Sequence, residues 1–360
     1  MKTLFTLLVI GVLCTAAPLC QAAQTAPNIS QEDLLAATIT TADLNTDYGD
    51  RAQWWPQFPE FYDSHFKDTP DELFYIVQNY THANPFDGRK IETALTLYNT
   101  SQGASDAFKN RSELTDKSVT LTTGPAVGDE CRYFTRLSTA RGKESTLRFR
   151  FDCVMVRITK LGSSDYAGSD TLASYAKPIA RRLKWLLAGK LKAQPISAAS
   201  TTLLPPDAAT TAVGPVLGTA RNPAEAWALI DSTNDPVKIR TWLYGAGAAI
   251  LLQRRYLLNA DPKQIVEAVL FTFPDAESAE KWCAYSLKDI KPSESLNPGR
   301  TGSFSGFSYK RSSAIYELTF AKGRYVADIS AWSPFDTTTS ACEFPVRSLG
   351  ELWYNSLPGR

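Results

Sequence analysis

Two stretches of the chain are near-copies of each other, and this repetition constrains the fold more than any other feature. They are residues 92–98, ETALTLY, and residues 267–273, EAVLFTF. Both are apolar and rich in β-formers, as expected of a strand in a buried sheet. A tyrosine and an Asn-Pro or Asp-Pro corner precede each copy, and an Ala-x-x-Ala pattern of helical spacing follows each one. The repetition predicts that one folding unit was duplicated.

Local patterns predict the same order of elements in each unit. In the first unit, strands are expected over 73–82, 91–98, 131–137, 146–151 and 154–159, with helices over 104–114 and 171–190. In the second unit, after the strand pair, a helix is expected over 275–286, strands over 304–309, 315–320 and 325–329, and a helix over 348–357. The predicted fold class is therefore α+β, with two tandem similar units, each an antiparallel sheet covered by helices on one face.

The second unit has an additional helix start in the sequence. Asn222 is of a type that caps helices, and Pro223 follows at the position where proline begins a helix. Glu225 stands where the acidic residue of a capping box belongs. We therefore expect a helix to begin at Asn222, with Trp227 on its buried side.

The chain divides by composition into five segments. Lys2, an apolar run from Leu4 to Ala17 and the small pair Ala22-Ala23 have the form of a secretory signal peptide, and the run is too short for a membrane span. Residues 193–213 are rich in Pro, Ala and Thr, which is typical of a linker. The expected segments are a signal peptide over 1–23, an N-terminal arm over 24–70, a first unit over 71–192, a linker over 193–213 and a second unit over 214–360.

These segments predict a protein that is periplasmic or secreted, with no transmembrane span in the mature chain. The full sequence has 38 Lys and Arg against 37 Asp and Glu, and removal of the signal peptide takes away only Lys2. Because the mature chain has balanced charge and no long basic run, nucleic-acid binding has little electrostatic basis.

Four cysteines remain after Cys14 and Cys20 leave with the signal peptide. They are Cys131, Cys153, Cys283 and Cys342, two in each unit. An even count in an exported chain favours disulfides. Of the three possible connectivities we prefer pairing within units, because the predicted hairpin brings Cys131 near Cys153. Four buried free thiols are the alternative.

The residues that carry most catalytic chemistry are scarce. The only histidines are His65 and His82, and neither has the local signature of a catalytic or metal site. We therefore predict no catalytic residue, no cofactor and no metal ligand. The acidic pair Asp129-Glu130 stands at the entrance of a strand, and a hydrolase would use such a pair for acid-base chemistry.

Aromatic residues are the best candidates for ligand contact. Adjacent tryptophans such as Trp54-Trp55 form a stacking platform for sugars or peptides when they are exposed. Alternatively they anchor the N-terminal arm, because large aromatic side chains are mostly buried. The candidate ligand-binding set is Trp54, Trp55, Trp332 and Tyr309.

The second unit resembles a class of exported bacterial proteins. The likeness lies in 243–246 (LYGA), Tyr256, the strand over 267–273, the alanines Ala276 and Ala279, and 322–326 (KGRYV). It resembles uncharacterised exported proteins, with a domain of unknown function built of duplicated α+β units. The resemblance implies the paired-unit fold and brings no catalytic residue with it.

We therefore expect an exported, non-catalytic binding or sensor-type protein. Its predicted ligand is a protein, peptide or glycan, held in the groove between the units or on their exposed sheet faces. One alternative is an envelope-polymer hydrolase that uses acidic residues such as Asp129 and Glu130. Another is a structural or assembly factor that pairs an exposed strand edge with a partner.

Overall fold

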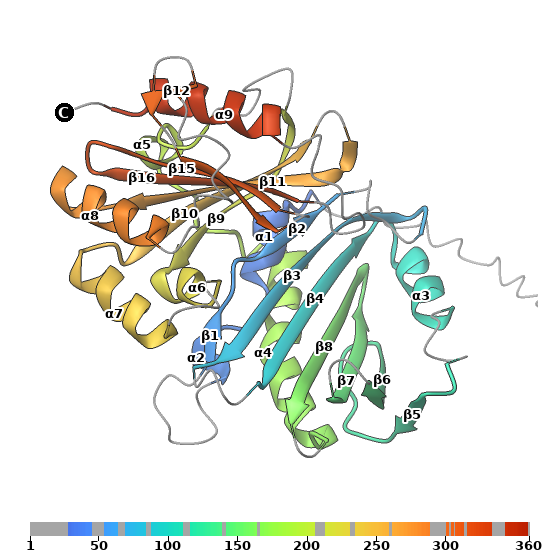
Figure 1. Ribbon diagram of the computed structural model, residues 1–360. Helices are drawn as coiled ribbons and strands as arrows, with labels where there is room; N and C mark the ends of the chain where they lie inside the picture. The colour runs from blue at the N-terminus through green and yellow to red at the C-terminus, as the bar shows by residue number, and fades with distance from the viewer. Residues whose placement is uncertain are drawn as a thin grey trace, which may run out of the picture.

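The computed structural model contains two large antiparallel sheets flanked by helices (Figure 1). The fold is therefore α+β, as predicted. The structure describes residues 28–44, 54–63, 69–83, 88–110, 116–138, 142–163, 166–205, 213–230, 235–258, 261–288, 300–301, 304–305, 307–312, 315–332 and 343–358. The predicted signal peptide lies outside these residues.

The first sheet has strand order β1-β3-β4-β8-β7-β6-β5, and the short strand β2 also pairs with β3. All of its pairs are antiparallel. The strands are β1 Trp54–Pro56, β2 Glu60–Tyr62, β3 Glu72–His82, β4 Lys90–Tyr98, β5 Val119–Thr122, β6 Glu130–Ser138, β7 Gly142–Phe151 and β8 Val154–Ser163.

The second sheet has strand order β14-β15-β16-β11-β10-β9, again antiparallel throughout. Its strands are β9 Val213–Pro223, β10 Ile250–Leu258, β11 Asp261–Thr272, β14 Phe307–Ser312, β15 Ile315–Lys322 and β16 Tyr325–Trp332, and a separate pair is formed by β12 Arg300–Thr301 and β13 Phe304–Ser305. The two repeated stretches of sequence lie in β4 and β11. Each has strand neighbours on both sides, which explains their apolar composition.

Helices lie on both faces of each sheet. They are α1 Gln31–Ala36, α2 Thr41–Leu44, α3 Ser101–Lys109, α4 Ser169–Leu187, α5 Ala198–Thr201, α6 Ala224–Ala228, α7 Pro236–Gly245, α8 Ala276–Leu287 and α9 Glu343–Ser356. On the first sheet, α4 packs on one face and α3 on the other (Figure 1). On the second sheet, α9 and α8 take the two faces. The expectation that helices cover one face only therefore needs correction.

The side chains of β8 point alternately to the two faces of the first sheet, which shows how helices come to pack on both faces. Val154 and Val156 point into the cluster that contains α4, whereas Met155 packs against Phe108 of α3. Successive side chains of a strand point to opposite faces, so an uninterrupted apolar run serves two helices at once.

The N-terminal arm joins the two sheets. Its strands β1 and β2 form the edge of the first sheet, yet Trp55 and Phe58 pack with α6, α7 and α8 beside the second sheet. Conversely, Leu257 and Ile265 of the second sheet belong to the cluster of the first. We expected each unit to enclose its own core, and this expectation is wrong because the arm makes the packing continuous.

The described part of the predicted linker, residues 193–205, packs on the second sheet. Leu204 is buried in its core, and the Leu203 carbonyl accepts a hydrogen bond of 2.6 Å from the Trp353 indole. The Pro205 carbonyl accepts from Arg254 at 2.7 Å and from Tyr256 at 2.8 Å. These contacts fix the end of the segment that leads into β9.

Cys131, Cys153 and Cys283 are free thiols, so the predicted pairing within units is wrong. A disulfide needs Cα atoms within about 7 Å of each other. The residue opposite Cys131 is Phe149, and Cys153 lies in the turn beyond Phe151. Cys342 lies outside the described residues. Burial raises the pKa of Cys153 to about 11 and that of Cys283 to about 12, which makes both thiols unreactive.

The helix expected at Asn222 also needs correction. Asn222 and Pro223 are the last residues of β9, and α6 begins one residue later, at Ala224. The Asn222 side chain does not cap the helix but donates to Gln253 at 2.9 Å. Sheet pairing with β10 therefore extends through the residues that resemble a helix start.

Gly218 of β9 allows the arm to approach the second sheet closely. A Cβ atom at this position would lie 2.4 Å from the Phe61 ring. We expect Gly218→Ala to lower the free energy of unfolding by about 1–3 kcal/mol, because Phe61 is fully buried and has no room to move. Urea unfolding measures the change.

Gly245→Ala is the matched control. A Cβ atom at Gly245 would meet no atom within 4 Å, and the residue lies in helix α7. We expect this change to stabilise the protein by about 0.5–1 kcal/mol. Equal effects of the two substitutions would contradict the close approach of arm and sheet.

Candidate functional site

The two predicted platform tryptophans are buried. Trp54 packs edge-on against His82, with ring centroids 5.7 Å apart, and Trp55 packs among α6, α7 and α8. The Arg240 guanidinium lies over the Trp55 ring at 5.3 Å. These contacts correspond to the alternative in which the pair anchors the arm, and they leave neither ring free to stack on a ligand.

The other two candidate aromatic residues lie in the second sheet. Trp332 ends β16 and is partly buried. Tyr309 lies on β14 opposite Glu317, and its side chain is outside the described part of the structure. Trp332 lies beside a buried charged group, as described below.

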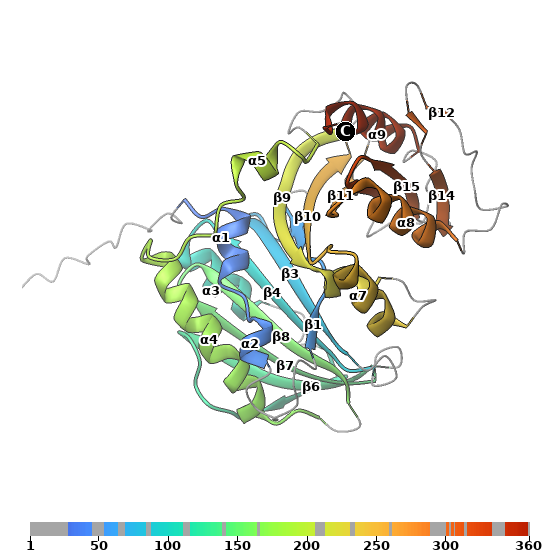
Figure 2. The ribbon, with the colours of Figure 1, turned by 90° about the vertical axis from the view of Figure 1, so that its left-hand side faces the viewer.

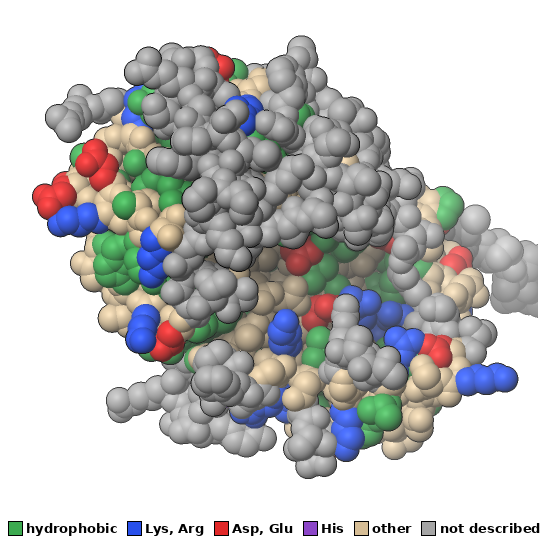
Figure 3. Space-filling model, viewed as in Figure 1, with side chains coloured by type: hydrophobic (Ala, Val, Ile, Leu, Met, Phe, Trp, Pro, Cys, Tyr) green, Lys and Arg blue, Asp and Glu red, His purple; other side chains and the backbone are tan. Residues whose placement is uncertain are grey.

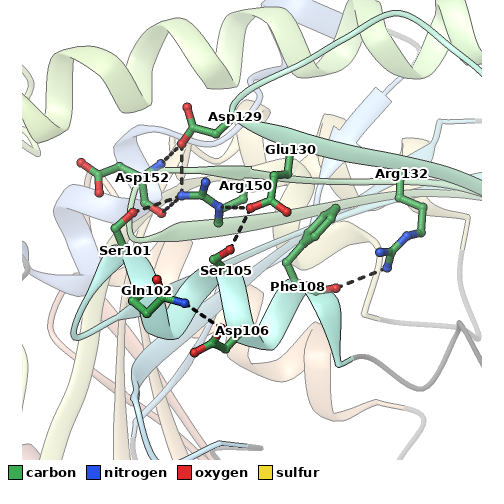
Figure 4. Close-up of polar contacts among 10 residues, drawn as sticks. All are labelled: Ser101, Gln102, Ser105, Asp106, Phe108, Asp129, Glu130, Arg132, Arg150 and Asp152. Atoms are coloured by element: carbon green, nitrogen blue, oxygen red, sulfur yellow. Dashed lines mark hydrogen bonds and ion pairs between the residues drawn. The ribbon is translucent and has the colours of Figure 1, made fainter. Parts of the chain in front are cut away.

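The acidic pair Asp129-Glu130 is tied to one arginine, Arg150 of β7 (Figure 4). Arg150 Nη1 lies 3.2 Å from Asp129 Oδ2, and Arg150 Nε donates to Glu130 Oε1 at 3.0 Å. Arg150 also donates to Ser101 Oγ and to the Asp152 carbonyl, while Ser105 donates to Glu130. The network joins the start of α3 to the ends of β6 and β7.

This arrangement holds the structure together and leaves little acid-base capacity. Burial alone would raise the pKa of Glu130, but hydrogen bonds from Ser105 and Arg150 outweigh burial and lower it. A general acid needs the opposite shift. The Asp129 carboxylate also accepts from the Asp152 amide at 2.7 Å, and Asp152 has a positive φ of 55°. Asp129 therefore stabilises a turn of uncommon backbone geometry.

Of the two histidines, the structure describes His82. His82 is buried against Trp54, with Arg89 Nη2 3.2 Å from its Nε2, and His65 lies outside the described residues. Within the described ranges, no group of three or more His, Cys, Asp or Glu side chains is arranged to hold a metal ion. Nor is any helix in those ranges both long enough and apolar enough to cross a bilayer.

A buried polar group lies where the arm meets the second sheet, and we call it the junction cluster. Its centre is Arg255 of β10, which is fully buried. The Arg255 guanidinium lies between two aromatic rings, Tyr62 of β2 and Trp332 of β16, each 5.3 Å from its central carbon. Glu267 of β11 lies 3.7 Å from Arg255 Nε. The cluster consists of Arg255, Glu267, Gln253, Tyr62 and Trp332.

Strand register brings these residues together. Arg255 is directly opposite Glu267, and Gln253 lies two residues before Arg255 on the same face of β10. Gln253 donates to Glu267 and, at 3.1 Å, to the Pro59 carbonyl of the arm. The cluster therefore includes groups from β2, β10, β11 and β16, which no local sequence pattern places side by side.

The neighbours of Arg255 do not satisfy its hydrogen-bond donors. Burial raises the pKa of Glu267 above its ordinary value, even though Arg255 and Gln253 act in the opposite direction. Glu267 Oε2 lies 3.7 Å from Arg255 Nε, too far for a hydrogen bond, so it does not satisfy the Arg255 donors. Within the described part of the chain, none of the three guanidinium nitrogens of Arg255 has a hydrogen-bond partner. Buried donors without partners are rare in folded proteins and call for an explanation.

The sequence analysis did not identify Arg255, Glu267, Gln253 or Tyr62 as site residues. One signal was available in the sequence, since Gln253 and Arg255 interrupt an otherwise apolar strand, ILLQRRYLL, at alternate positions. Polar residues on one face of a buried strand indicate a polar contact there.

The surface of the molecule that faces the viewer in Figure 3 is hollowed between the part that contains α8 and α9 and the part that contains β4, β8 and β7. Acidic, basic and apolar side chains lie in the hollow.

Comparison with known proteins adds little to this geometry. No family model matches the chain, and no curated protein matches it in sequence. Among solved structures, it is similar to the extracellular domain of PknH from Mycobacterium tuberculosis, with 12% identity and a TM-score of 0.33. That match covers 45% of this chain and 99% of the other.

Glu130 provides a test of the Arg150 network. Because its pKa is lowered in the folded protein, its contribution to stability is present above the pKa of the unfolded chain and is lost as the pH falls. We expect Glu130→Gln to cost about 1–2 kcal/mol at neutral pH and less in acid. Urea unfolding across this range measures the difference. Asp106→Asn, at an exposed position of α3, is the control, and a cost for Glu130→Gln that does not change with pH would contradict the assignment.

Glu267 is expected to show the opposite pH dependence. Its raised folded-state pKa means that its contribution is full below the pKa of the unfolded chain and is lost as the pH rises through the folded value. Relative to the wild type, Glu267→Gln should therefore gain stability as the pH rises from the pKa of the unfolded chain through the raised pKa of Glu267 in the fold, by about 1.4 kcal/mol for each unit of pKa difference. The exposed Glu277→Gln of α8 is the matched control. If the wild type and Glu267→Gln respond alike to pH, Glu267 is ionised in the fold.

Proposed function

We propose that this chain is an exported binding protein that holds a carboxylate-bearing ligand, such as a peptide terminus or an acidic sugar, at the junction cluster. One observation carries the proposal. Arg255 is fully buried between Tyr62 and Trp332, while its three guanidinium nitrogens have no hydrogen-bond partner in the described part of the chain.

The first step concerns free energy. A buried donor without an acceptor costs about 1–3 kcal/mol, and more when the donor is charged. Arg255 has several such donors. A ligand oxygen that accepts from them removes this cost only in the bound state, so the unused donors favour binding.

The second step concerns the chemical class of the ligand. The planar guanidinium fork matches a carboxylate, which accepts two parallel hydrogen bonds. Glu267 lies 3.7 Å from Arg255 Nε and satisfies none of the guanidinium donors, which therefore stay available to a ligand carboxylate. The Tyr62 and Trp332 rings supply the flat apolar surfaces on which sugars and peptides stack. Charge and shape together favour an acidic peptide or glycan.

The third step concerns access. Arg255 is covered on both faces by rings, and its nitrogens are buried. A ligand therefore reaches Arg255 only when one of the two covering side chains, Tyr62 or Trp332, turns aside. Trp332 is the last residue of β16 and is only partly buried, so its side chain is the part of the site that opens.

The order of elements supports the origin that we propose, a tandem duplication. In each half a strand pair is followed by a helix, and the run of strands after that helix ends in three consecutive strands of the large sheet and a closing helix, β6, β7, β8 and α4 in one half and β14, β15, β16 and α9 in the other. The spatial orders β3-β4-β8-β7-β6 and β10-β11-β16-β15-β14 then correspond position by position. In both halves an edge segment pairs with the first strand, β1 and β2 in one and β9 in the other. The proposed ligand site lies where these two edge segments meet.

The two alternative functions have less support. A hydrolase that uses Asp129 and Glu130 would need acids free to exchange protons, and Arg150 engages both carboxylates. An assembly role through a strand edge has β5 as its candidate, at the end of the first sheet with Leu121 exposed. The binding proposal is preferred because Arg255 is a specific group with unused bonding capacity.

Matched ligand pairs test the proposal. We expect glucuronate, or an acetylated tripeptide with a free carboxyl terminus, to raise the melting temperature of the full mature protein. Glucose and the tripeptide amide should have no effect, since they lack the carboxylate. Arg255→Gln should abolish the response to the acids. Differential scanning fluorimetry measures the shifts, and isothermal titration calorimetry then gives the affinities.

Two further variants keep this test informative. Arg324→Gln removes the same charge from an exposed position in the turn before β16, and it should leave the response intact. Arg255→Lys keeps the positive charge but not the planar fork, so it should respond more weakly to the acids than the wild type does. This variant replaces Arg255→Gln in the test if Arg255→Gln does not fold. The proposal fails if the carboxylates and their neutral partners act alike, or if Arg255→Gln still responds.

A further inference from the structure

Helix α4 has one buried face and one cationic face. Leu172, Ile179, Leu183 and Leu186 pack into the core of the first sheet. On the opposite side, the exposed positions follow helical spacing and are occupied by Lys177, Arg181, Lys184 and Trp185. Figure 2 shows α4 along the outside of the first sheet, beside α1 and α2. The cationic face is therefore part of the outer surface.

The charge of this region is segregated from that of the rest of the chain. Between residues 171 and 205 the sequence has six basic residues and no Asp or Glu, although the whole chain is close to neutral. Two of the six are neutralised by α1 and α2, because Arg182 pairs with Asp43 at 2.8 Å and Lys192 pairs with Asp33 at 2.8 Å. Within the described ranges, the other four have no carboxylate partner. These are Lys177, Arg181, Lys184 and Lys190.

A tryptophan lies among these unpaired cations. Trp185 is 44% exposed, although its size and apolar ring normally favour burial. The Arg181 guanidinium lies over its ring at 5.4 Å. A tryptophan beside lysines and arginines on one face of an amphipathic helix is typical of a protein surface that rests on a membrane interface.

We propose that the outer face of α4 docks on the surface of a bilayer that contains anionic phospholipid. The four cations are complementary to lipid phosphates, and the Trp185 ring fits the boundary between headgroups and acyl chains. The opposite face of α4 stays packed on the sheet, so docking requires no unfolding. An exported chain, as the signal peptide predicts, meets such a bilayer as its most extended anionic surface.

Vesicle binding tests this proposal with the full mature protein. We expect co-sedimentation with vesicles of phosphatidylcholine mixed with phosphatidylglycerol, and little with phosphatidylcholine alone. Added salt should weaken the binding, because exposed charges are screened. The triple variant Lys177→Gln, Arg181→Gln, Lys184→Gln should lower the affinity on the order of a hundredfold, since each cation near an anionic surface contributes about fivefold.

Two controls separate this surface from general charge. The triple variant Lys109→Gln, Lys117→Gln, Lys238→Gln removes the same charge from exposed positions elsewhere, and it should bind as the wild type does. Trp185→Ala should bind more weakly while keeping its salt dependence. The proposal is overturned if the wild type does not bind anionic vesicles or if both triple variants lose affinity equally. It is also overturned if the protein binds a soluble polyanion such as heparin but no vesicle.

Discussion

The structure depends on one short segment, Trp54 to Tyr62, which belongs to two sheets at once. Its backbone pairs with β3 of the first sheet, while its side chains and carbonyls contact the second. Phe61 packs against Gly218, the Pro59 carbonyl accepts from Gln253, and Tyr62 covers Arg255. Because these contacts lie within a few residues of each other, the segment fixes how the two sheets sit together, and each sheet supplies part of the same polar site.

This arrangement has a free-energy cost, because the Arg255 cation is held away from water at the junction. Apolar clusters on either side stabilise the surrounding fold, including the rings of Trp227, Phe271 and Trp282 beside Phe58. That packing allows the molecule to tolerate the unused donors of Arg255. Binding surfaces commonly retain such locally unfavourable groups, since a group already satisfied within the fold has little left to offer a ligand.

Much of the fold could be predicted from local pattern. Strands such as β4, β8 and β16 follow from apolar runs, and α4 follows from its helical spacing, because these signals lie within each element. The site could not be predicted in the same way. Arg255 meets Tyr62 only after the arm folds across the second sheet, so its burial depends on residues far away in the sequence. The cysteine pairing failed for a related reason, since the register of β6 against β7 sets Phe149, not a cysteine, opposite Cys131. Helix α7 was not predicted, although Asp235 caps it and Pro236 begins it.

The two fully embedded thiols have a practical consequence. Cys153 lies in the core of the first sheet and Cys283 on α8 beside the second, and both are protonated near neutral pH. A thiol-specific label therefore modifies each one only during a transient opening of its own surroundings. The labelling rates of Cys153 and Cys283, measured by mass spectrometry, would therefore report local opening separately in each half of the molecule, without any engineered cysteine.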